Sequence, residues 1–221
     1  MIDIHTHILP NVDDGSSSLE DSLAMVKHEL SIGVNTIICT PHHILHRYDK
    51  TVEEIKQSYK LLTEEVKRQN LPVTILLGQE ICYTHREDAI KLLQEGKLLT
   101  LNNTNYVLLE FSFTREPEDI TDIIYNFSIK GYKVIVAHVE RYNWITLDKV
   151  MSLKSEGTII QVNSGAIIGA AGWKEKRFSH KLLKKGLVDV IASDVHSFRY
   201  STLDKAYKKV KNPKLFEFKF E

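Results

Sequence analysis

The chain has 221 residues, of which 43% are hydrophobic and 26% are charged, and its 29 basic residues balance 29 acidic ones. A chain of this length and apolar content builds its own core, which excludes a disordered protein and a small disulfide scaffold. Balanced charge argues against a general nucleic-acid binder. No window approaches the roughly 18 to 20 apolar residues of a membrane span, and the first residues lack a signal-peptide pattern. We therefore expect a soluble, cytoplasmic protein with no nucleic-acid partner and no membrane insertion.

Short apolar runs alternate with segments of helical periodicity. Seven runs rich in Val, Ile and Leu have the length of buried strands, at residues 2–4, 36–40, 73–77, 106–109, 133–137, 158–162 and 187–192. Apolar stripes at helical spacing separate them, at residues 19–30, 52–66, 120–127, 147–153 and 182–183. This alternation predicts an α/β fold with a parallel sheet, and seven strands favour a barrel over a short open sheet. We expect one domain over residues 1–221.

Helix boundaries are also marked in the sequence. Ser18 with Asp21, and Thr51 with Glu54, precede the first two stripes and predict N-terminal caps. Glycines follow four of the stripes, where a left-handed C-terminal cap favours glycine: Gly33, Gly131, Gly157 and Gly186.

Residues of one chemical kind follow the strand-like runs. Six of the seven runs lead into imidazoles or carboxylates, namely His5 and His7, His42 and His43, Glu80, Glu110, His138, and Asp194 with His196. The seventh leads into Gln161-Val162-Asn163. Because parallel strands place all their carboxyl ends on one face, these side chains should meet at a single mouth.

Such a mixture of imidazole and carboxylate suits Mn, Fe or Zn. His5 and His7 occupy alternate positions of one extended segment, so both side chains reach the same side. Four carboxylates would lie at this mouth: Asp14, Glu80, Glu110 and Asp194. Buried together without cations they would be prohibitively unfavourable, whereas several divalent ions would neutralise them.

Each residue taken singly has a simpler explanation. His28 and His180 fall within helices and His85 near a helix start, which indicates surface or capping roles. His43 and His46 fit either a supporting or a rim position. Asp3 could orient His5 or cap the first strand, and Asp13-Asp14-Gly15 could be a plain turn. Six strand ends carrying the same chemistry are together harder to explain by chance.

The cysteines point away from thiolate chemistry. Cys39 and Cys82 fall in or beside apolar runs and are expected to be small buried hydrophobes. A cysteine phosphatase needs an arginine six positions after its nucleophile, but Leu45 and Asp88 stand at those positions.

The motifs resemble the polymerase and histidinol phosphatase (PHP) superfamily, and more closely its bacterial manganese-dependent protein-tyrosine phosphatases of capsule and exopolysaccharide synthesis. The resemblance runs in order from residue 2 to about residue 200. Its segments are Ile2-Asp3-Ile4-His5-Thr6-His7 with Asp13-Asp14-Gly15, Thr40-Pro41-His42-His43, Gly78-Gln79-Glu80-Ile81, Leu109-Glu110-Phe111, Ala137-His138-Val139-Glu140-Arg141 and Ala192-Ser193-Asp194-Val195-His196.

The resemblance implies a distorted seven-stranded β/α barrel with a three-metal site that holds Mn, with Fe, Co or Zn also possible. It assigns one ion to His5, His7, Glu80 and Asp194, a second to Glu80, Glu110 and His138, and a third to Asp14, His42 and His196. Glu80 bridges two ions, and Arg141 engages the phosphoryl group. Catalysis is thereby expected from Arg141, Glu80 and His42, with water activated by the metals as nucleophile.

Two positions depart from the family pattern. Val139 replaces a frequent proline, which should matter little because neither side chain binds metal. Arg199 lies slightly earlier than the arginine that often follows the last histidine, so its role in substrate binding is open. Rim contacts from Arg47, Tyr48, Arg115 and Tyr142 compete with the simpler view that these are solvated loop residues.

The implied substrate is the phosphorylated, tyrosine-rich tail of a bacterial tyrosine kinase, and an oligomer is possible. Two alternatives stay open: a small-molecule phosphatase of the same superfamily, such as a histidinol-phosphatase, and a non-catalytic metal-binding module.

Overall fold

Parallel strands form the centre of the protein. The computed structural model describes residues 1–197 and 199–220. Every strand pairing between its elements is parallel, in the orders β1-β2-β4 and β3-β5-β6-β7-β8-β9. The strands are β1 (Ile2–Thr6), β2 (Thr36–Cys39), β3 (His42–His43), β4 (Thr74–Leu77), β5 (Glu80–Cys82), β6 (Tyr106–Glu110), β7 (Lys133–Val136), β8 (Ile159–Asn163) and β9 (Val190–Ala192).

The two sheets are parts of one curled sheet. Only Thr40 and Pro41 separate β2 from β3, and proline has no N–H to donate to the ladder. A two-residue break also separates β4 from β5, so seven strand positions remain, as the sequence predicts. The first and last positions meet, because the Asp194 N–H donates to the His5 carbonyl (2.9 Å) and the His7 N–H to the Val195 carbonyl (3.0 Å). The expected α/β fold with a parallel sheet is confirmed.

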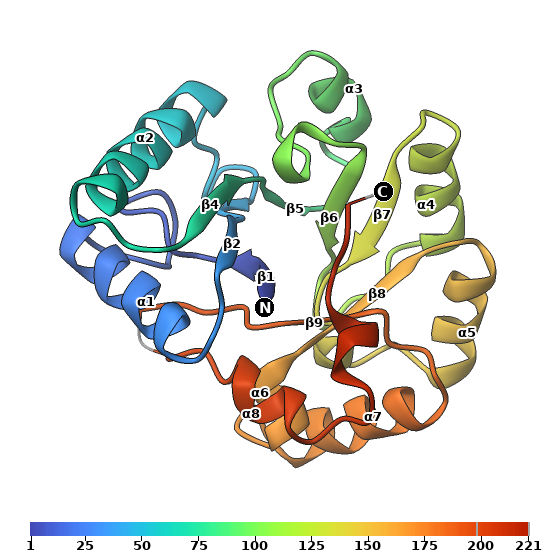
Figure 1. Ribbon diagram of the computed structural model, residues 1–221. Coiled ribbons are helices and arrows are strands. Elements are labelled where there is room, and N and C mark those ends of the chain that lie inside the picture. Colours follow the sequence, from blue (N-terminus) through green and yellow to red (C-terminus); the bar gives the residue numbers. More distant parts are fainter. Residues whose placement is uncertain (198, 221) are drawn as a thin grey trace.

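Helices surround the strands (Figure 1). They are α1 (Leu19–Ser31), α2 (Val52–Arg68), α3 (Ala89–Gln94), α4 (Ile120–Ser128), α5 (Leu147–Ser155), α6 (Ser164–Ile168), α7 (Trp173–Lys184) and α8 (Leu203–Tyr207), with 3-10 turns η1 (Leu101–Asn103), η2 (Val139–Arg141) and η3 (Pro213–Phe216). The caps expected at Ser18 and Thr51 are present, and Thr51 forms a reciprocal capping box with Glu54. The expected glycine caps have positive φ. The short helices α3, α6 and α8 carry too little periodicity to be predicted.

The strands separate two apolar cores. Val107 and Leu109 belong to the larger core that the helices cover, whereas Leu108 between them belongs to a smaller cluster inside the curled sheet. This alternation follows the two-residue period of a strand. The inner cluster also contains Ile4 and Ile135 from other strands, so the interior is filled rather than hollow.

Aromatic residues close the N-terminal end of this interior. Tyr106 begins β6, and its ring meets that of Phe218 edge-on at 5.0 Å. Phe220 contacts Phe218 in the same way at 5.1 Å. The C-terminal segment thus runs across the strand ends, as Figure 1 shows in red. Throughout the described residues, every helix is too short or too polar to cross a membrane.

Candidate metal centre

The interior changes from apolar to polar along single strands. Leu108 is part of the inner apolar cluster, and Glu110, two residues further along β6, is a candidate ligand. Ala192 and Asp194 stand in the same relation at β9. Because the side-chain period of a strand is two residues, each interior row ends in a polar group at the carboxyl end. The sheet therefore gathers the predicted residues at one mouth.

An irregularity in β1 adds two histidines to this mouth. Asp3 pairs with Ile37 and Thr6 with Cys39, so three steps along β1 match two along β2. The extra residue is a β-bulge, which re-aims the following side chains. Ile4 consequently lines the apolar interior, while His5 reaches the polar cluster directly above it.

Four of the predicted ligands form the middle of the cluster. Glu80 Oε2 lies 3.1 Å from His5 Nε2 and 3.3 Å from His7 Nε2, and Asp194 Oδ1 lies 3.5 Å from both nitrogens. The two Nε2 atoms are 3.2 Å apart. An ion with bonds of 2.0 to 2.2 Å in tetrahedral geometry separates its ligand atoms by about 3.3 to 3.6 Å. The observed spacings are close to that range.

The hydrogen bonds of these histidines orient their lone pairs towards the carboxylates. His5 Nδ1–H donates to Gln161 Oε1 (3.1 Å), and His7 Nδ1 pairs with Asp13 Oδ2 (2.7 Å). Both Nε2 atoms are thereby turned towards each other and towards acidic oxygens. Glu80 Oε2 is fully buried and accepts no hydrogen bond from the described residues. Buried nitrogen and oxygen atoms that converge in this way need positive charge between them, from protons on the imidazoles or from a cation, so the donor set fits a metal ion.

His138 and Glu110 lie on one side of this middle. His138 Nε2 is 2.9 Å from Glu80 Oε1 and 3.6 Å from Glu110 Oε1. His42 Nδ1 lies 2.9 Å from Glu80 Oε2 and 3.9 Å from Glu110 Oε2. Glu80 therefore contacts both parts of the cluster, which is the position a bridging ligand occupies.

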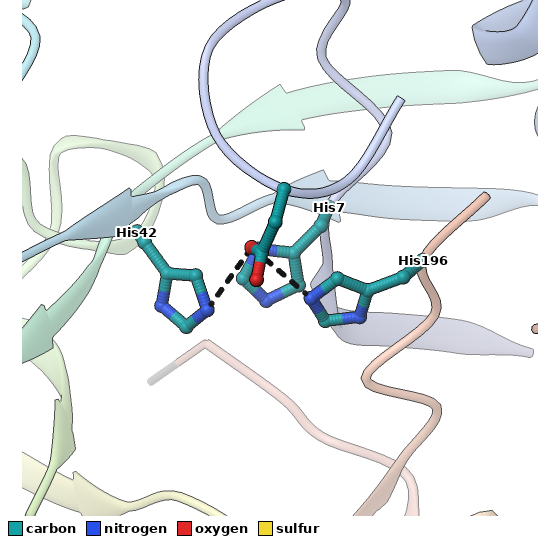
Figure 2. A group of neighbouring side chains, drawn as sticks. His7, His42 and His196 are labelled. Atoms are coloured by element: carbon teal, nitrogen blue, oxygen red, sulfur yellow. Dashed lines mark ion pairs between the residues drawn. The ribbon is translucent and has the colours of Figure 1, made fainter. Parts of the chain in front are cut away.

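Asp14 and two histidines form the other side. Asp14 Oδ1 is 3.6 Å from His42 Nε2 and 3.6 Å from His196 Nε2. Figure 2 shows these two pairs as dashed lines, with His7 beside them. The His7 and His196 rings stack at 4.1 Å. All nine predicted ligands thus lie in one cluster, and their division among individual ions stays a prediction because His7 and His42 each border two groups.

Sequence reasoning missed the residues that support the ligands. Asp13 Oδ2 accepts the His42 N–H (2.8 Å) as well as pairing with His7, and its Oδ1 accepts the Gly15 N–H (2.9 Å). Asp13 was visible only as part of a motif or a turn. Gly15 packs so closely that a Cβ there would lie 2.0 Å from the His7 carbonyl oxygen. This loop therefore needs both the carboxylate and the glycine.

The seventh strand contributes hydrogen bonds in place of ligands. Gln161 Oε1 accepts from the His138 N–H (3.0 Å) besides His5, and Gln161 Nε2 donates to Asn163 Oδ1 (2.7 Å). Asn163 Nδ2 in turn donates to Asp194 Oδ2 (2.7 Å). The run that lacked an imidazole or carboxylate is thus the one that holds three ligands in place.

Two candidate ligands have left-handed backbone. φ is 31° at His138 and 54° at Asp194, a region that few non-glycine residues adopt. The Gln161 side chain and the His5 carbonyl hold these two N–H groups. Strain of this kind concentrates at functional sites.

The electrostatics of the cluster favour added positive charge. Burial by itself lowers the pKa of His5, but Glu80 and Asp194 outweigh it and raise that pKa to about 9. Burial together with the charge of Glu80 raises the pKa of Glu110 to about 7. Burial by itself raises the pKa values of Glu80 and Asp194, but the charge of His5 outweighs it and holds both well below their ordinary range. Protons on the imidazoles thus supply positive charge at the place where a divalent ion would supply it.

Arginines border the cavity above the cluster. Its volume is about 180 Å³, and its lining includes Arg47, Arg141 and Arg199 together with ligand-type residues. Arg141 Nη1 donates to Asp194 Oδ2 at 3.0 Å, and its guanidinium lies 4.1 Å from the centre of the Phe113 ring. Arg141 is thereby held against the cavity wall, where phosphate oxygens would meet its remaining donors.

The rim residues divide into two groups. Tyr48 stacks over His42 at 5.9 Å, and Arg115 is exposed in the loop after β6. Tyr142 was expected at the rim or in solvent, and this expectation is wrong. Its side chain is 3% exposed, and its hydroxyl accepts the Phe111 N–H (3.1 Å). A large ring beside the inner ligands is buried by packing, whatever its loop position suggests.

The remaining histidines stand apart from the cluster. His28 is half-buried rather than a surface residue, and its Nε2–H donates to the Ser201 carbonyl (2.9 Å). His180 donates in the same way to the Ile167 carbonyl (2.9 Å). His43 pairs with Glu87 at 2.7 Å, whereas His46 and His85 are exposed.

Both cysteines are free thiols. Cys39 is fully buried, which raises its pKa, and burial together with nearby carboxylates raises the pKa of Cys82 to about 12. Neither thiol is poised to ionise, in agreement with the sequence.

The curled parallel sheet and its mouth of imidazoles and carboxylates define a PHP-type fold with a candidate metal centre. A histidinol phosphate phosphatase from Lactococcus lactis shares the fold, with a TM-score of 0.60 at 15% identity over 88% of this chain and 85% of that one. The sequence model of the capsular polysaccharide synthesis CpsB/CapC family matches residues 1–214. The chain belongs to this family.

Curated relatives agree with that assignment. The tyrosine-protein phosphatase YwqE of Bacillus subtilis is 35% identical over 202 residues, which are 90% of this chain and 78% of YwqE. CpsB of Streptococcus agalactiae is 34% identical over 94% of this chain and 88% of its own. Crystal structures of YwqE and of CpsB from Streptococcus pneumoniae, described as unique metal-dependent tyrosine phosphatases, include a match with a TM-score of 0.90 and 31% identity, over 98% of this chain and 91% of that chain.

Proposed function

We propose that this chain is a metal-dependent protein-tyrosine phosphatase that acts in capsular or exopolysaccharide synthesis. The observation that carries the proposal is a cluster of nine ligand-type side chains, five of which line a cavity that Arg141 borders, in a chain of the CpsB/CapC family. Relatives that are 34% to 35% identical to this chain are named tyrosine-protein phosphatases. The proposal treats residues 1–221 as one catalytic domain.

The residues proposed to hold metal are His5, His7, Asp14, His42, Glu80, Glu110, His138, Asp194 and His196. Mn is the proposed ion, and the mixed imidazole and carboxylate set also accepts Fe, Co and Zn. Bound divalent ions supply Lewis-acid stabilisation of the phosphoryl oxygens and lower the pKa of the attacking water.

The chain's own contribution is to position and neutralise the substrate. Arg141, fixed by Asp194 and Phe113, would bind the phosphoryl oxygens, and Arg199 and Arg47 add positive charge to the same cavity. Phosphoryl transfer is accelerated mainly by positioning and charge stabilisation, so a protein nucleophile is unnecessary.

Tyrosine suits this arrangement better than serine or threonine. A phenol has a pKa of about 10 and leaves as phenolate without strong protonation. The proposed protein substrate is the phosphorylated tyrosine-rich tail of a bacterial tyrosine kinase, and the reaction would take place in the cytoplasm.

Kinetics on matched substrates test the proposal. Metal-stripped protein reconstituted with Mn should hydrolyse a phosphotyrosine peptide far faster than histidinol phosphate or the same peptide with phosphoserine. Chelation should abolish turnover, while Cys39→Ser should leave it largely intact. Activity that resists chelators, or a preference for histidinol phosphate, would overturn the assignment, and binding of metal without turnover would favour a regulatory module.

A further inference from the structure

A second cavity lies beside the metal centre at the same mouth. Its volume is about 320 Å³, and its walls come from the loops that follow β5 and β6. Tyr83 and Phe111 begin these loops, directly after the strands that carry Glu80 and Glu110. The Tyr83 N–H donates to the Glu110 carbonyl at 2.8 Å, so the floor of this cavity is tied to a candidate ligand.

The floor of the cavity is aromatic. The Tyr83 and Phe111 rings lie 5.8 Å apart, and Pro117 from the same lining adds an apolar face. Phe113, two residues beyond Phe111, lines the metal cavity and lies under Arg141. A single loop therefore forms a wall of both cavities.

The rim of the cavity is cationic. Arg86 and Arg115 enter from the two loops and are exposed. Within residues 1–197 and 199–220, neither guanidinium has an ion pair or a side-chain hydrogen bond. The lining contains two acids, and Glu116 is paired with Lys149. The positive charges of the two arginines therefore exceed the one remaining negative charge, that of Glu118.

We propose that this cavity, bounded by Tyr83, Phe111, Arg86 and Arg115, binds a second phosphotyrosine side chain on the peptide whose first phosphotyrosine occupies the metal centre. The aromatic floor matches the phenyl ring, and unpaired guanidiniums bind phosphate oxygens in bidentate fashion. This inference rests on the proposed function and specifies its substrate: a peptide with two neighbouring phosphotyrosines. Because the cavities share a loop, an extended peptide at about 3.3 Å per residue crosses from one to the other within a few residues.

Steady-state kinetics with a matched peptide series test the site. The series holds one phosphotyrosine fixed and places phosphotyrosine, glutamate or alanine at each of the next positions on either side, with para-nitrophenyl phosphate as a small substrate. For the wild type, KM should be about five- to tenfold lower for the best doubly phosphorylated peptide than for its alanine counterpart, as expected for exposed charge pairs. The glutamate peptide should lie close to alanine, because it lacks the ring.

Variants locate the effect in the cavity. In Arg86→Ala/Arg115→Ala the KM advantage of the second phosphotyrosine should disappear, while turnover of para-nitrophenyl phosphate stays unchanged. Arg177→Ala, an exposed arginine on α7 outside this lining, should keep the advantage. Equal KM values across the wild-type series, an equal benefit from glutamate, or loss of the advantage in Arg177→Ala would overturn the inference.

The inference and the proposed function fail separately. Calorimetric binding of a doubly phosphorylated peptide to metal-free protein, compared between wild type and the double variant, measures the cavity without catalysis. Tighter binding by the wild type supports the site even if no substrate turns over, and identical binding overturns it even in an active phosphatase.

Discussion

From the N-terminal ends to the middle of the strands the interior is filled by Tyr106, Phe218 and aliphatic residues such as Leu108, whereas at the carboxyl ends it is filled by acids and imidazoles. The first arrangement stabilises the fold through apolar burial and ring contacts. The second opposes folding until cations neutralise it. The comparison teaches that stability and chemistry are separated along the strands, by as little as one side-chain period between Leu108 and Glu110. Substitutions at the two ends should therefore have separable effects.

The largest effect is expected at the centre of the polar end. Glu80→Gln removes the charge that contacts His5, His7 and His42. Phosphatase activity should fall by at least about 10³-fold, because the bridging position and its charge are lost together. Metal stoichiometry by elemental analysis should fall as well.

Glu64→Gln on the exposed face of α2 is the matched control and should retain both activity and metal. Full metal content in Glu80→Gln would remove Glu80 from the ligand set.

The opposite end should respond in stability alone. Phe218→Ala removes a ring that is 7% exposed and packs on Tyr106 and Phe220. The free energy of unfolding should fall by about 3 kcal/mol, at the lower end for a buried phenylalanine because the segment lies near the chain end. At 25 °C kcat/KM should be unchanged. Tyr125→Ala, 55% exposed, should change neither quantity, and an activity loss in Phe218→Ala that metal cannot restore would break the separation.

A smaller effect, on metal affinity, is expected at Asp13, which holds two candidate ligands by hydrogen bonds. Asp13→Asn keeps the shape of the side chain but weakens its hold on His7 Nδ1 and the His42 N–H. Loss of such a supporting carboxylate typically lowers metal affinity by about 10- to 100-fold. Metal titration followed by thermal shift should show this, and excess Mn should restore turnover. Asp122→Asn, exposed on α4, is the control, and unchanged affinity in Asp13→Asn would limit Asp13 to shaping the loop.

The sequence predicted the polar end well because its information is local. A buried run followed by an imidazole or carboxylate has the same meaning at β6 and at β9, and parallel strands bring such residues together. The bulge in β1 was not predictable, because it depends on register with β2 rather than on the β1 residues alone. Gln161 and Asn163 were noted but not assigned, since a hydrogen-bonding role depends on distances between strands.

Glu29 was missed although its signal is visible in the sequence. It lies three residues after Val26 on the apolar face of α1, and it is fully buried. The spacing of Glu29 places it on the apolar face of the helix. The helical pattern alone does not show whether a carboxylate on that face is buried or reaches solvent.

The last prediction is a pH dependence of stability at Glu29, a buried carboxylate near Asp3 of β1. Burial, with the nearby charge of Asp3, raises the pKa of Glu29 from 4.5 to about 9. The folded chain therefore binds this proton more tightly than the unfolded chain. Its contribution to stability is complete below pH 4.5 and is lost as pH rises towards 9. Glu29→Gln, which has no proton to lose, should become more stable relative to the wild type by up to about 1.4 kcal/mol per pH unit in that window.

Urea unfolding at several pH values between 5 and 8.5 measures this difference. Asp3, whose pKa burial raises to about 6, interacts with Glu29, so the difference between the two proteins reports the ionisation of Glu29 together with its effect on Asp3. Glu64→Gln should run parallel to the wild type at every pH. If Glu29→Gln also runs parallel, Glu29 ionises at its ordinary pKa despite its burial, and the apolar face of α1 does not oppose the charge of this carboxylate.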